Sequence, residues 1–319
     1  MNNILKNFNF CIDNTIKEKI KTFSKKIRLK IESYILICLS FIFSKLNIKL
    51  SYILARILGI LIYFFIPIRK KVAYYNLKRV FRKKSNREIY AIIMKMYINF
   101  SYFFLESIIM KKLRIDKIYG LKDNVKVYGL EILQEAVNKE KGVILYTGHI
   151  GNWHVMGQKL VELGFPINNV IKRQRNPFIF EKEMNTMLNA GMKISILQKT
   201  PKNIFQALKE KDVVEFLADQ DAGKDGIFVD FFGLKASTAV GPALFSLKLG
   251  SPLIFAVDIR EKFYKHKIFI EKIDYTSIDD KEKDIYNLTK LLTQKIEKYI
   301  ISNPSQYFWL HRRWFTRPK

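Results

Sequence analysis

The sequence contains little of what marks several common classes of protein. Only two of its 319 residues are cysteine and only four are histidine. Cys11 and Cys38 are too few for a disulfide framework or a zinc site, which favours a protein that faces the cytosol. The first 30 residues lack the apolar run and the small-residue cleavage site of a signal peptide. The chain also contains no internal repeat and no low-complexity linker.

Signatures of cofactor binding are missing as well. The sequence has neither a Gly-rich phosphate loop nor a dinucleotide fingerprint, so we expect no nucleotide cofactor. His149 and His154 stand five residues apart, whereas paired metal ligands on a helix stand four apart and so share a face. We therefore expect no metal site.

Acidic residues are scarce beside basic ones. The chain has 56 Lys and Arg against 29 Asp and Glu, a formal net charge of +27. Such a surplus suits nucleic acid, an anionic membrane surface or an acidic macromolecule. A composition rich in Lys, Ile and Asn throughout explains part of the surplus without any partner. Because no nucleic-acid-binding motif accompanies the charge, we expect no nucleic-acid partner.

Apolar residues, in contrast, are abundant, at 49% of the chain. Two apolar stretches lie near the N-terminus. Residues 34–44 are too few to span a bilayer, whereas residues 50–68, interrupted only by Arg56, approach the roughly 20 residues that a spanning helix needs. Basic residues flank the second stretch, and the positive-inside rule places the domain after it in the cytoplasm. We predict a basic tail and membrane-associating helices over residues 1–85, spanning the bilayer or lying in its interface; a buried helical hairpin is the alternative.

From residue 86 onward, short β-rich runs alternate with helical patterns. Strands are expected at 125–128, 142–147, 169–172, 194–197, 213–218, 252–259 and 266–270. Helices are expected at 130–137, 152–163, 178–190, 201–210, 238–249 and 280–301. This alternation predicts an α/β domain over residues 86–319, with a central, mostly parallel sheet flanked by helices.

The most informative segment is YTGHIGNWHVMG, residues 146–157. A buried strand leads directly into Gly148 and His149, and a helix begins a few residues later. Functional groups of α/β sheets gather at the carboxyl ends of strands. Gly148 and Gly151 leave room for a substrate and expose N–H groups near the start of a helix. From its position alone, His149 is either a functional group or a structural histidine that caps a turn.

This segment and several others resemble, in order along the chain, motifs of the lipid A lauroyl/myristoyl acyltransferase family. The resemblance covers residues 45–318, with blocks at 72–81, 149–154, 172–177, 216–221, 229–243 and 308–318. It implies transfer of a fatty-acyl group from an acyl thioester, with acyl carrier protein as donor, to a hydroxyl of a lipid A precursor or related glycolipid. It also implies an inner-membrane location with the catalytic domain facing the cytoplasm. No cofactor is implied, because a thioester is already activated.

The resemblance also implies roles for individual residues. His149 would take the proton of the acceptor hydroxyl, and Asn152 or the backbone N–H groups at 151–152 would stabilise the oxyanion. Three basic residues after a strand would hold phosphates, or form a solvated surface instead. The aromatic loop at 228–232 would line an acyl groove or simply pack in the core. The candidate substrate-binding residues are Lys172, Arg173, Arg175, Asn176, Asp219 and Asp221.

Position 154 departs from the family pattern, which has an acidic residue there. A neutral His154 can fix the tautomer of His149 but cannot supply a negative charge. Three alternatives are open. His154 is a weaker catalytic partner, another carboxylate such as Asp219 or Asp221 replaces the missing acid, or the chain is a catalytically weak or inactive lipid-binding relative.

Overall fold

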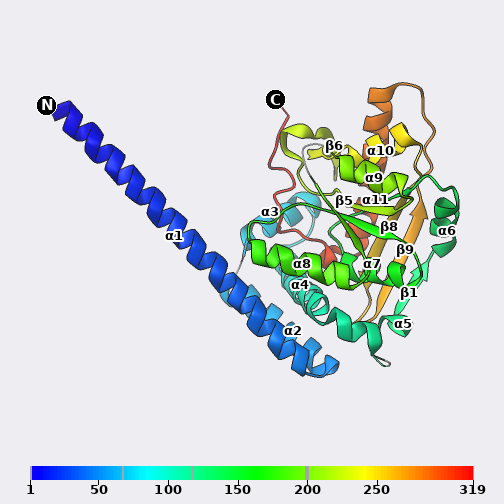
Figure 1. Ribbon diagram of the computed structural model, residues 1–319, viewed down its shortest axis with the longest axis horizontal. Coiled ribbons are helices and arrows are strands. Elements are labelled where there is room, and N and C mark those ends of the chain that lie inside the picture. The colour runs from blue at the N-terminus through cyan, green and yellow to red at the C-terminus, as the bar shows by residue number, and fades with distance from the viewer. Residues whose placement is uncertain (1, 67, 117, 119, 198–200, 319) are drawn as a thin grey trace.

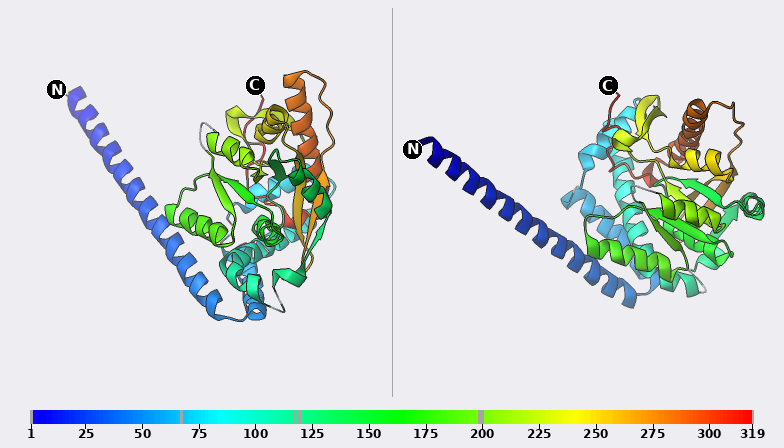
Figure 2. Two further views of the ribbon diagram at one scale, coloured as in Figure 1. Left: turned by 45° about the vertical axis from the view of Figure 1, so that its right-hand side comes forward. Right: turned by 45° about the horizontal axis from the view of Figure 1, so that its top comes forward.

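A computed structural model describes residues 2–318 apart from 67, 117, 119 and 198–200. The side chains of residues 2–21, 25 and 115, and with them Cys11, lie outside the description. Cys38 carries an exposed free thiol. The chain forms an α/β body with two N-terminal helices on one flank (Figures 1 and 2).

The helices are α1 (Asn2–Lys45), α2 (Ile48–Phe65), α3 (Lys70–Val80), α4 (Asn86–Ile115), α5 (Leu121–Asn124), α6 (Leu130–Asn138), α7 (Trp153–Glu162), α8 (Pro177–Asn189), α9 (Lys202–Lys209), α10 (Gly241–Leu249) and α11 (Lys281–Ser302). The strands are β1 (Val125–Tyr128), β2 (Val143–Thr147), β3 (Ile167–Ile171), β4 (Lys193–Ile196), β5 (Val213–Leu217), β6 (Ile227–Phe231), β7 (Leu234–Thr238), β8 (Leu253–Arg260) and β9 (His266–Lys272). Short 3-10 turns, η1 (Gly223–Asp225) and η2 (Pro304–Gln306), complete the chain.

The main sheet has seven strands in the order β1-β9-β8-β2-β5-β3-β4. Strands β8, β2, β5, β3 and β4 run parallel to one another, while β9 returns antiparallel beside β8 and pairs in parallel with β1. The predicted fold class, a mostly parallel sheet flanked by helices, is therefore confirmed. The carboxyl ends of the five parallel strands share one edge of the sheet.

Helices cover both faces of the sheet, which explains why its central strands are apolar without alternation. All five residues of β2 and all eight of β8 are buried. Ile144 and Tyr146 of β2 pack in one core with α3, α9, α10, α11 and the first half of α4. Val143 and Leu145 face the opposite core, with α6, α7, α8 and the second half of α4.

The N-terminal region differs from the prediction in two respects. Residues 34–44 are not a separate short segment but the end of α1, whose described part packs against α4 and α8. Helix α4, 30 residues long, is absent from the sequence prediction, although its start is well encoded: Ser85 and Glu88 form a reciprocal capping box. The second apolar stretch forms α2, which packs along α4. The predicted division after residue 85 coincides with the start of α4 and remains a prediction.

Apolar side chains of α1 and α2 face outward. Among the described residues, α2 and the segment Asn86–Arg114 of α4 are long and apolar enough to cross a membrane, by length and composition only. Half of an 18-residue apolar stretch within that segment of α4 is buried inside the protein, but only a third of α2. The exposed apolar residues of α1 and α2 are Phe23, Ile27, Ile31, Tyr34, Ile35, Ile37, Phe41, Ile42, Leu50, Ile53, Leu54, Ile57, Leu61, Phe64 and Phe65.

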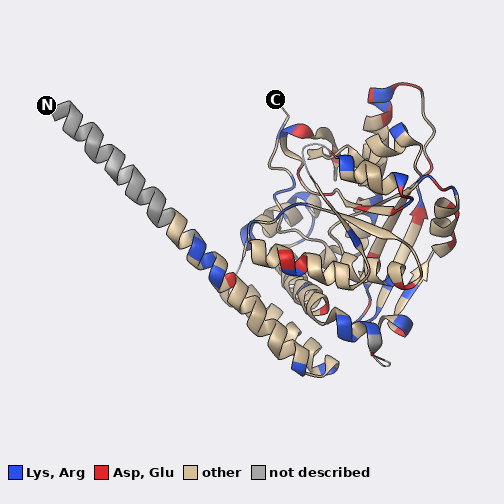
Figure 3. Cartoon of the chain, viewed as in Figure 1, with Lys and Arg blue, Asp and Glu red and all other residues tan. Residues whose placement is uncertain are grey.

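Two further features qualify the sequence predictions. The segment expected as an aromatic loop is a β-hairpin, because β6 and β7 pair antiparallel across a turn at Phe232 and Gly233, both with positive φ. Lys and Arg are distributed over many elements rather than gathered on one (Figure 3). The charge surplus by itself thus marks no single binding face.

Candidate active site

The register of two central strands brings His149 and Asp219 together. Thr147 of β2 pairs with Leu217 of β5, and each candidate residue lies two positions beyond its strand. The Nδ1 atom of His149 lies 2.6 Å from Oδ1 of Asp219, and the backbone N–H of His149 donates to Oδ2 at 3.0 Å. Both oxygens of Asp219 therefore hold the same residue, one fixing its backbone and the other its ring.

The surroundings of Asp219 keep its carboxyl group ionised. Its side chain is 1% exposed, and burial alone would raise the pKa of this carboxyl. The charge and hydrogen bonds of His149, together with the charge of Arg313, outweigh burial and lower the pKa of Asp219 to about 2. The His149 side chain keeps 20% of its surface exposed, so a buried carboxylate orients a histidine that a substrate can reach.

Aromatic rings frame His149. Its ring lies 5.0 Å from that of Trp153 and 6.2 Å from that of Phe308, centre to centre. Phe103 of α4 extends this apolar wall, with its ring 4.3 Å from that of Trp153. Phe100 stacks on Phe308 at 5.1 Å. The histidine thus sits at the end of an apolar surface shared by α4, the start of α7 and the C-terminal segment.

The C-terminal segment closes this side of the site. Tyr307 forms a β-bridge with Ile150, and the N–H of Phe308 donates to the carbonyl of His149 at 2.9 Å. Arg313 is 2% exposed and donates to the backbone of Ser237 in the β6–β7 hairpin. The C-terminal segment therefore connects the β6–β7 hairpin to the loop that contains His149.

Asn152 caps α7 rather than facing a substrate. Its Oδ1 accepts from the N–H groups of His154 and Val155, at 3.0 and 3.2 Å, and its Nδ2 donates to Glu106 at 2.6 Å. Its own N–H donates to Asp258 at 2.7 Å. The side chain is fully buried, so the structure assigns the predicted oxyanion donor to positioning instead.

Gly151, the other predicted donor, is also engaged, because its N–H donates to the carbonyl of Gln306 at 3.1 Å. Its φ is +64°, and a Cβ there would lie 1.8 Å from the carbonyl oxygen of Asp258. Glycine is required here for close backbone approach inside the protein.

A buried ionic network supports Asn152 from behind. Glu106 of α4 accepts hydrogen bonds from Asn152, from Tyr52 of α2 at 2.6 Å and from the guanidinium of Arg260. His266 lies between Glu106 and Asp258, with its Nδ1 2.9 Å from both carboxylate oxygens of Asp258. Burial would lower the pKa of His266, but the charge of Asp258 outweighs it and raises the pKa to about 9. This network ties α2 and α4 to the loop after His149.

His154 is not placed as the partner of His149. It is 4% exposed, and its Nδ1 lies 2.9 Å from the hydroxyl of Ser107 on α4. Burial, with the nearby charge of His149, lowers the pKa of His154 to about 4, so the ring is neutral at physiological pH. Of the alternatives for the missing acid, the geometry favours Asp219.

The other predicted binding residues separate into two groups. Lys172, Arg173 and Arg175 are exposed in the loop after β3, at the same sheet edge as His149, and their side chains form no hydrogen bond or ion pair within the described part of the chain. Asn176 instead caps α8 and also donates to the carbonyl of Leu29 on α1 at 3.0 Å. Asp221 accepts from the hydroxyl of Thr316 at 2.8 Å, which fastens the C-terminal segment.

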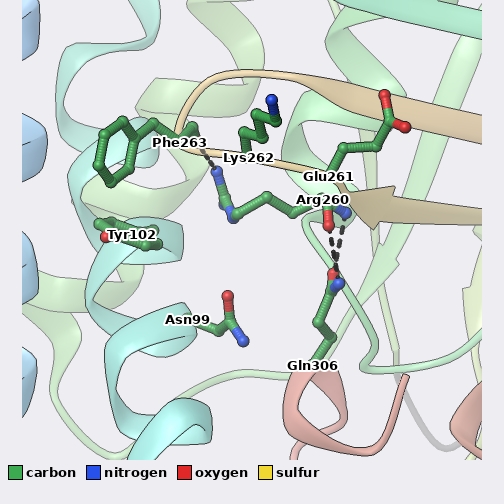
Figure 4. Close-up of a pocket in the computed structure, with 7 residues that line it drawn as sticks. All are labelled: Asn99, Tyr102, Arg260, Glu261, Lys262, Phe263 and Gln306. Carbon is green, nitrogen blue, oxygen red and sulfur yellow. Dashed lines mark hydrogen bonds between the residues drawn. The ribbon is translucent and has the colours of Figure 1, made fainter. Parts of the chain in front are cut away.

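A pocket of about 450 Å³ lies beside the network, between α4, η2 and the β8–β9 turn (Figure 4). Gln306 closes one wall through two 2.9 Å hydrogen bonds to the backbone of Arg260. His149 does not line this pocket, so we distinguish it from the candidate active site. No group of three or more His, Cys, Asp or Glu in the described residues could hold a metal ion.

Several residues of the site carried no sequence signal. Phe103, Ser107 and Glu106 lie on the unpredicted helix α4. Glu183 of α8, whose Oε1 atom lies 3.8 Å from Nε2 of His154, is outside every quoted motif. Phe308 and Arg313 belong to the C-terminal block, but only the fold places them beside residues more than 70 positions earlier.

Comparison with known proteins agrees with this geometry. The family model for bacterial lipid A biosynthesis acyltransferases matches residues 20–316. The chain is 26% identical to the lipid A biosynthesis lauroyltransferase of Escherichia coli K12, over 82% of this chain and 84% of that one. It is 24% identical to a phosphatidylinositol mannoside acyltransferase of Mycobacterium tuberculosis H37Rv, over 64% of this chain and 61% of the relative. The match thus spans about three fifths of the mycobacterial protein.

Proposed function

Because the chain belongs to the bacterial lipid A biosynthesis acyltransferase family and is an acyltransferase, we propose that it transfers a fatty-acyl group from acyl carrier protein to a hydroxyl of a lipid A precursor or related glycolipid. The observation that carries this proposal is the 2.6 Å contact between His149 and a buried, ionised Asp219 at the carboxyl edge of the sheet. The lipid-binding, inactive alternative loses its main support, since His149 has a carboxylate partner despite His154.

His149 and Asp219, together called the dyad below, suit general-base catalysis. The Nε2 atom of His149 takes the proton of the acceptor O–H, and the oxygen attacks the thioester carbonyl. The tetrahedral intermediate then collapses with cleavage of the C–S bond, and the leaving thiolate takes the proton back from His149. Asp219 keeps the ring proton on Nδ1 and stabilises the imidazolium form, as the aspartate of a Ser-His-Asp triad does.

Two neighbouring surfaces fit the two substrates. The rings of Trp153, Phe103 and Phe308 offer an apolar wall along which an acyl chain can lie out of water. Lys172, Arg173 and Arg175 offer exposed cations to phosphates of the glycolipid or of the carrier's prosthetic group. Both surfaces border the edge where His149 lies.

The location proposed is the inner membrane, with the catalytic domain on the cytoplasmic side. The outward-facing apolar residues of α1 and α2 support contact with lipid, and basic residues beside them suit an anionic surface. A second acceptor class, a mannoside glycolipid, is favoured by the relatives that carry that name.

The test is acyl transfer from radiolabelled acyl carrier protein to a lipid A precursor in detergent, with acyl coenzyme A as an alternative donor. We expect transfer by the unaltered chain and loss of transfer in His149→Ala. Transfer to a phosphatidylinositol mannoside instead would identify a mannoside glycolipid, the second acceptor class, as the acceptor. Absence of transfer to either acceptor from either donor would refute the proposal.

A further inference from the structure

The pocket between α4, η2 and the β8–β9 turn has the size of a ligand site that the proposed reaction does not use. Its volume is about 450 Å³, and small-molecule sites have volumes of about 300–1,000 Å³. In Figure 4 the β8–β9 turn lies across the pocket from Asn99 of α4 and Gln306 of η2. Because His149 does not line the pocket, a molecule bound there is separate from the reacting groups.

Two buried polar side chains line this pocket. Arg260 is 8% exposed, and the carbon of its guanidinium lies 5.2 Å from the ring centre of Tyr102. The guanidinium donates to Glu106 and to the carbonyl of Phe263, so its charge is balanced and it holds the turn in place. Tyr102 is 6% exposed, yet its hydroxyl forms no hydrogen bond within the described part of the chain. A hydroxyl without a partner on a buried side chain is a donor left for a ligand.

The mouth of the pocket has a positive charge that no acidic group balances. Lys262 of the turn is exposed and lines the pocket, and its side chain forms no hydrogen bond or ion pair with any described residue. Glu261, the acidic residue of the lining, is paired with Lys267 at 2.5 Å. An anion in the pocket is therefore attracted by Lys262 without repulsion from an unpaired carboxylate of the lining.

The pocket adjoins helix α2, whose outer face is apolar. The ring of Tyr52 on α2 lies 5.5 Å from that of Tyr102 and 6.0 Å from that of Phe263, and both of these line the pocket. Arg56 follows Tyr52 by one turn on the same face of α2 and is exposed. Aromatic and basic side chains beside an apolar face are typical of the level at which lipid head groups lie.

We propose that this pocket binds the phosphate of an anionic phospholipid, with Lys262 and Arg56 as the cations at its mouth. The head group enters between the β8–β9 turn and α4, and the acyl chains lie along the outward apolar residues of α2. Charge complementarity and the adjoining apolar face favour a lipid over a soluble phosphate, which would gain nothing from contact with α2. The lipid is bound as a ligand and not as the acyl acceptor, because His149 lies outside the pocket.

The first test is thermal unfolding of the full chain in a neutral detergent, with phosphatidylglycerol, phosphatidylcholine or inorganic phosphate added. A ligand that binds the folded state raises the unfolding midpoint as its concentration increases. We expect a clear rise with anionic phosphatidylglycerol and a much smaller one with zwitterionic phosphatidylcholine. An equal rise with both lipids would refute the charge argument. An equal rise with inorganic phosphate would refute the lipid as the source of the phosphate.

Variants separate the pocket from the general attraction of a basic surface to anionic lipid. Lys262→Gln should weaken the apparent affinity for phosphatidylglycerol about fivefold or more, because a charge-assisted hydrogen bond is lost. Lys265→Gln is the matched control, since Lys265 is exposed in the same turn but does not line the pocket; its affinity should stay within about twofold of the original. Lys262→Gln combined with Arg56→Gln should abolish the preference for phosphatidylglycerol over phosphatidylcholine. Equal effects of Lys262→Gln and Lys265→Gln would overturn the site.

Filling the pocket tests its shape apart from its charge. Asn99→Phe keeps every cation but occupies the space between α4 and the turn, so it should weaken the affinity for phosphatidylglycerol at least as much as Lys262→Gln. Unchanged affinity in this variant would show that the lipid binds only at the surface.

Photochemical cross-linking locates the lipid even if Asn99→Phe does not fold. A phosphatidylglycerol with a photoreactive group on its head group should label the β8–β9 turn and the part of α4 around Asn99, as identified by mass spectrometry. Labelling confined to α1 or to the basic loop after β3 would refute the proposed position. Neither measurement uses acyl transfer, so failure of the proposed function would leave this inference standing, and the reverse also holds.

Discussion

Replacement of Asp219 by Asn is the most direct test of the dyad. The amide is nearly isosteric with the carboxylate, so the two contacts to His149 keep their length while the charge disappears. Its NH₂ group can also hold His149 in the tautomer whose Nδ1 is an acceptor, which puts the ring proton on Nε2, where the base must be free.

The expected loss in kcat follows from the contact between Asp219 and His149. The carboxylate lies 2.6 Å from Nδ1, is 1% exposed and has a pKa of about 2, so it is fully charged whenever the ring takes a proton. The same substitution in a Ser-His-Asp triad lowers kcat about 10⁴-fold. We therefore expect a loss of about 10³ to 10⁴ in kcat for Asp219→Asn, which is about 4 to 5.5 kcal/mol of transition-state stabilisation.

The assay is single-turnover acyl transfer, which reports the chemical step without product release. Asp221→Asn is the control, because this neighbouring carboxylate binds Thr316 and not His149; its kcat should change less than about threefold. A folded Asp219→Asn variant with more than a tenth of the original kcat would refute the dyad as the source of the rate.

Three further predictions concern other parts of the chain. Burial raises the pKa of Glu215 to about 8, against 4.5 for an ordinary carboxyl; the folded state then binds the extra proton between these values, so stability falls as pH rises through this window. Glu215→Gln should flatten that pH dependence and raise the free energy of unfolding at pH 8.5 by up to several kcal/mol. Thermal unfolding at pH 5 and pH 8.5 measures this. If stability changes equally with pH in both proteins, the assignment is contradicted. Tyr52→Phe removes one hydrogen bond to buried Glu106 and should lower the free energy of unfolding by about 1 to 2 kcal/mol in detergent denaturation experiments, whereas no change would mean that α2 is not held through this bond. Arg173→Ala with Arg175→Ala should raise KM several-fold at constant kcat, and the difference should shrink in high salt; a salt-independent effect would point to altered structure instead of lost phosphate binding.

The fold class and the position of His149 could be predicted from local sequence patterns. Uninterrupted apolar strands such as 143–147 can only be buried on both faces, which predicts a parallel sheet between helices. His149 stands at the end of such a strand beside glycines, which is a local pattern. The long apolar stretch near the N-terminus was also recognisable in the sequence. These features depend on neighbours within a few residues, and local sequence encodes them.

The resemblance offers Asp219 and Asp221 as possible partners of His149, but only the tertiary structure decides between them. Asp219 is 70 residues away, and only the pairing of β2 with β5 brings it within 2.6 Å. The spacing from His149 to position 154 singles out His154, but the helix carries that side chain toward Ser107 and Glu183 instead. The local motif likewise predicts a catalytic role for Asn152, whereas its bond to Glu106 on α4 fixes it as a helix cap. Strand order and helix packing set these contacts through many weak interactions at once, so no short segment of the sequence determines them.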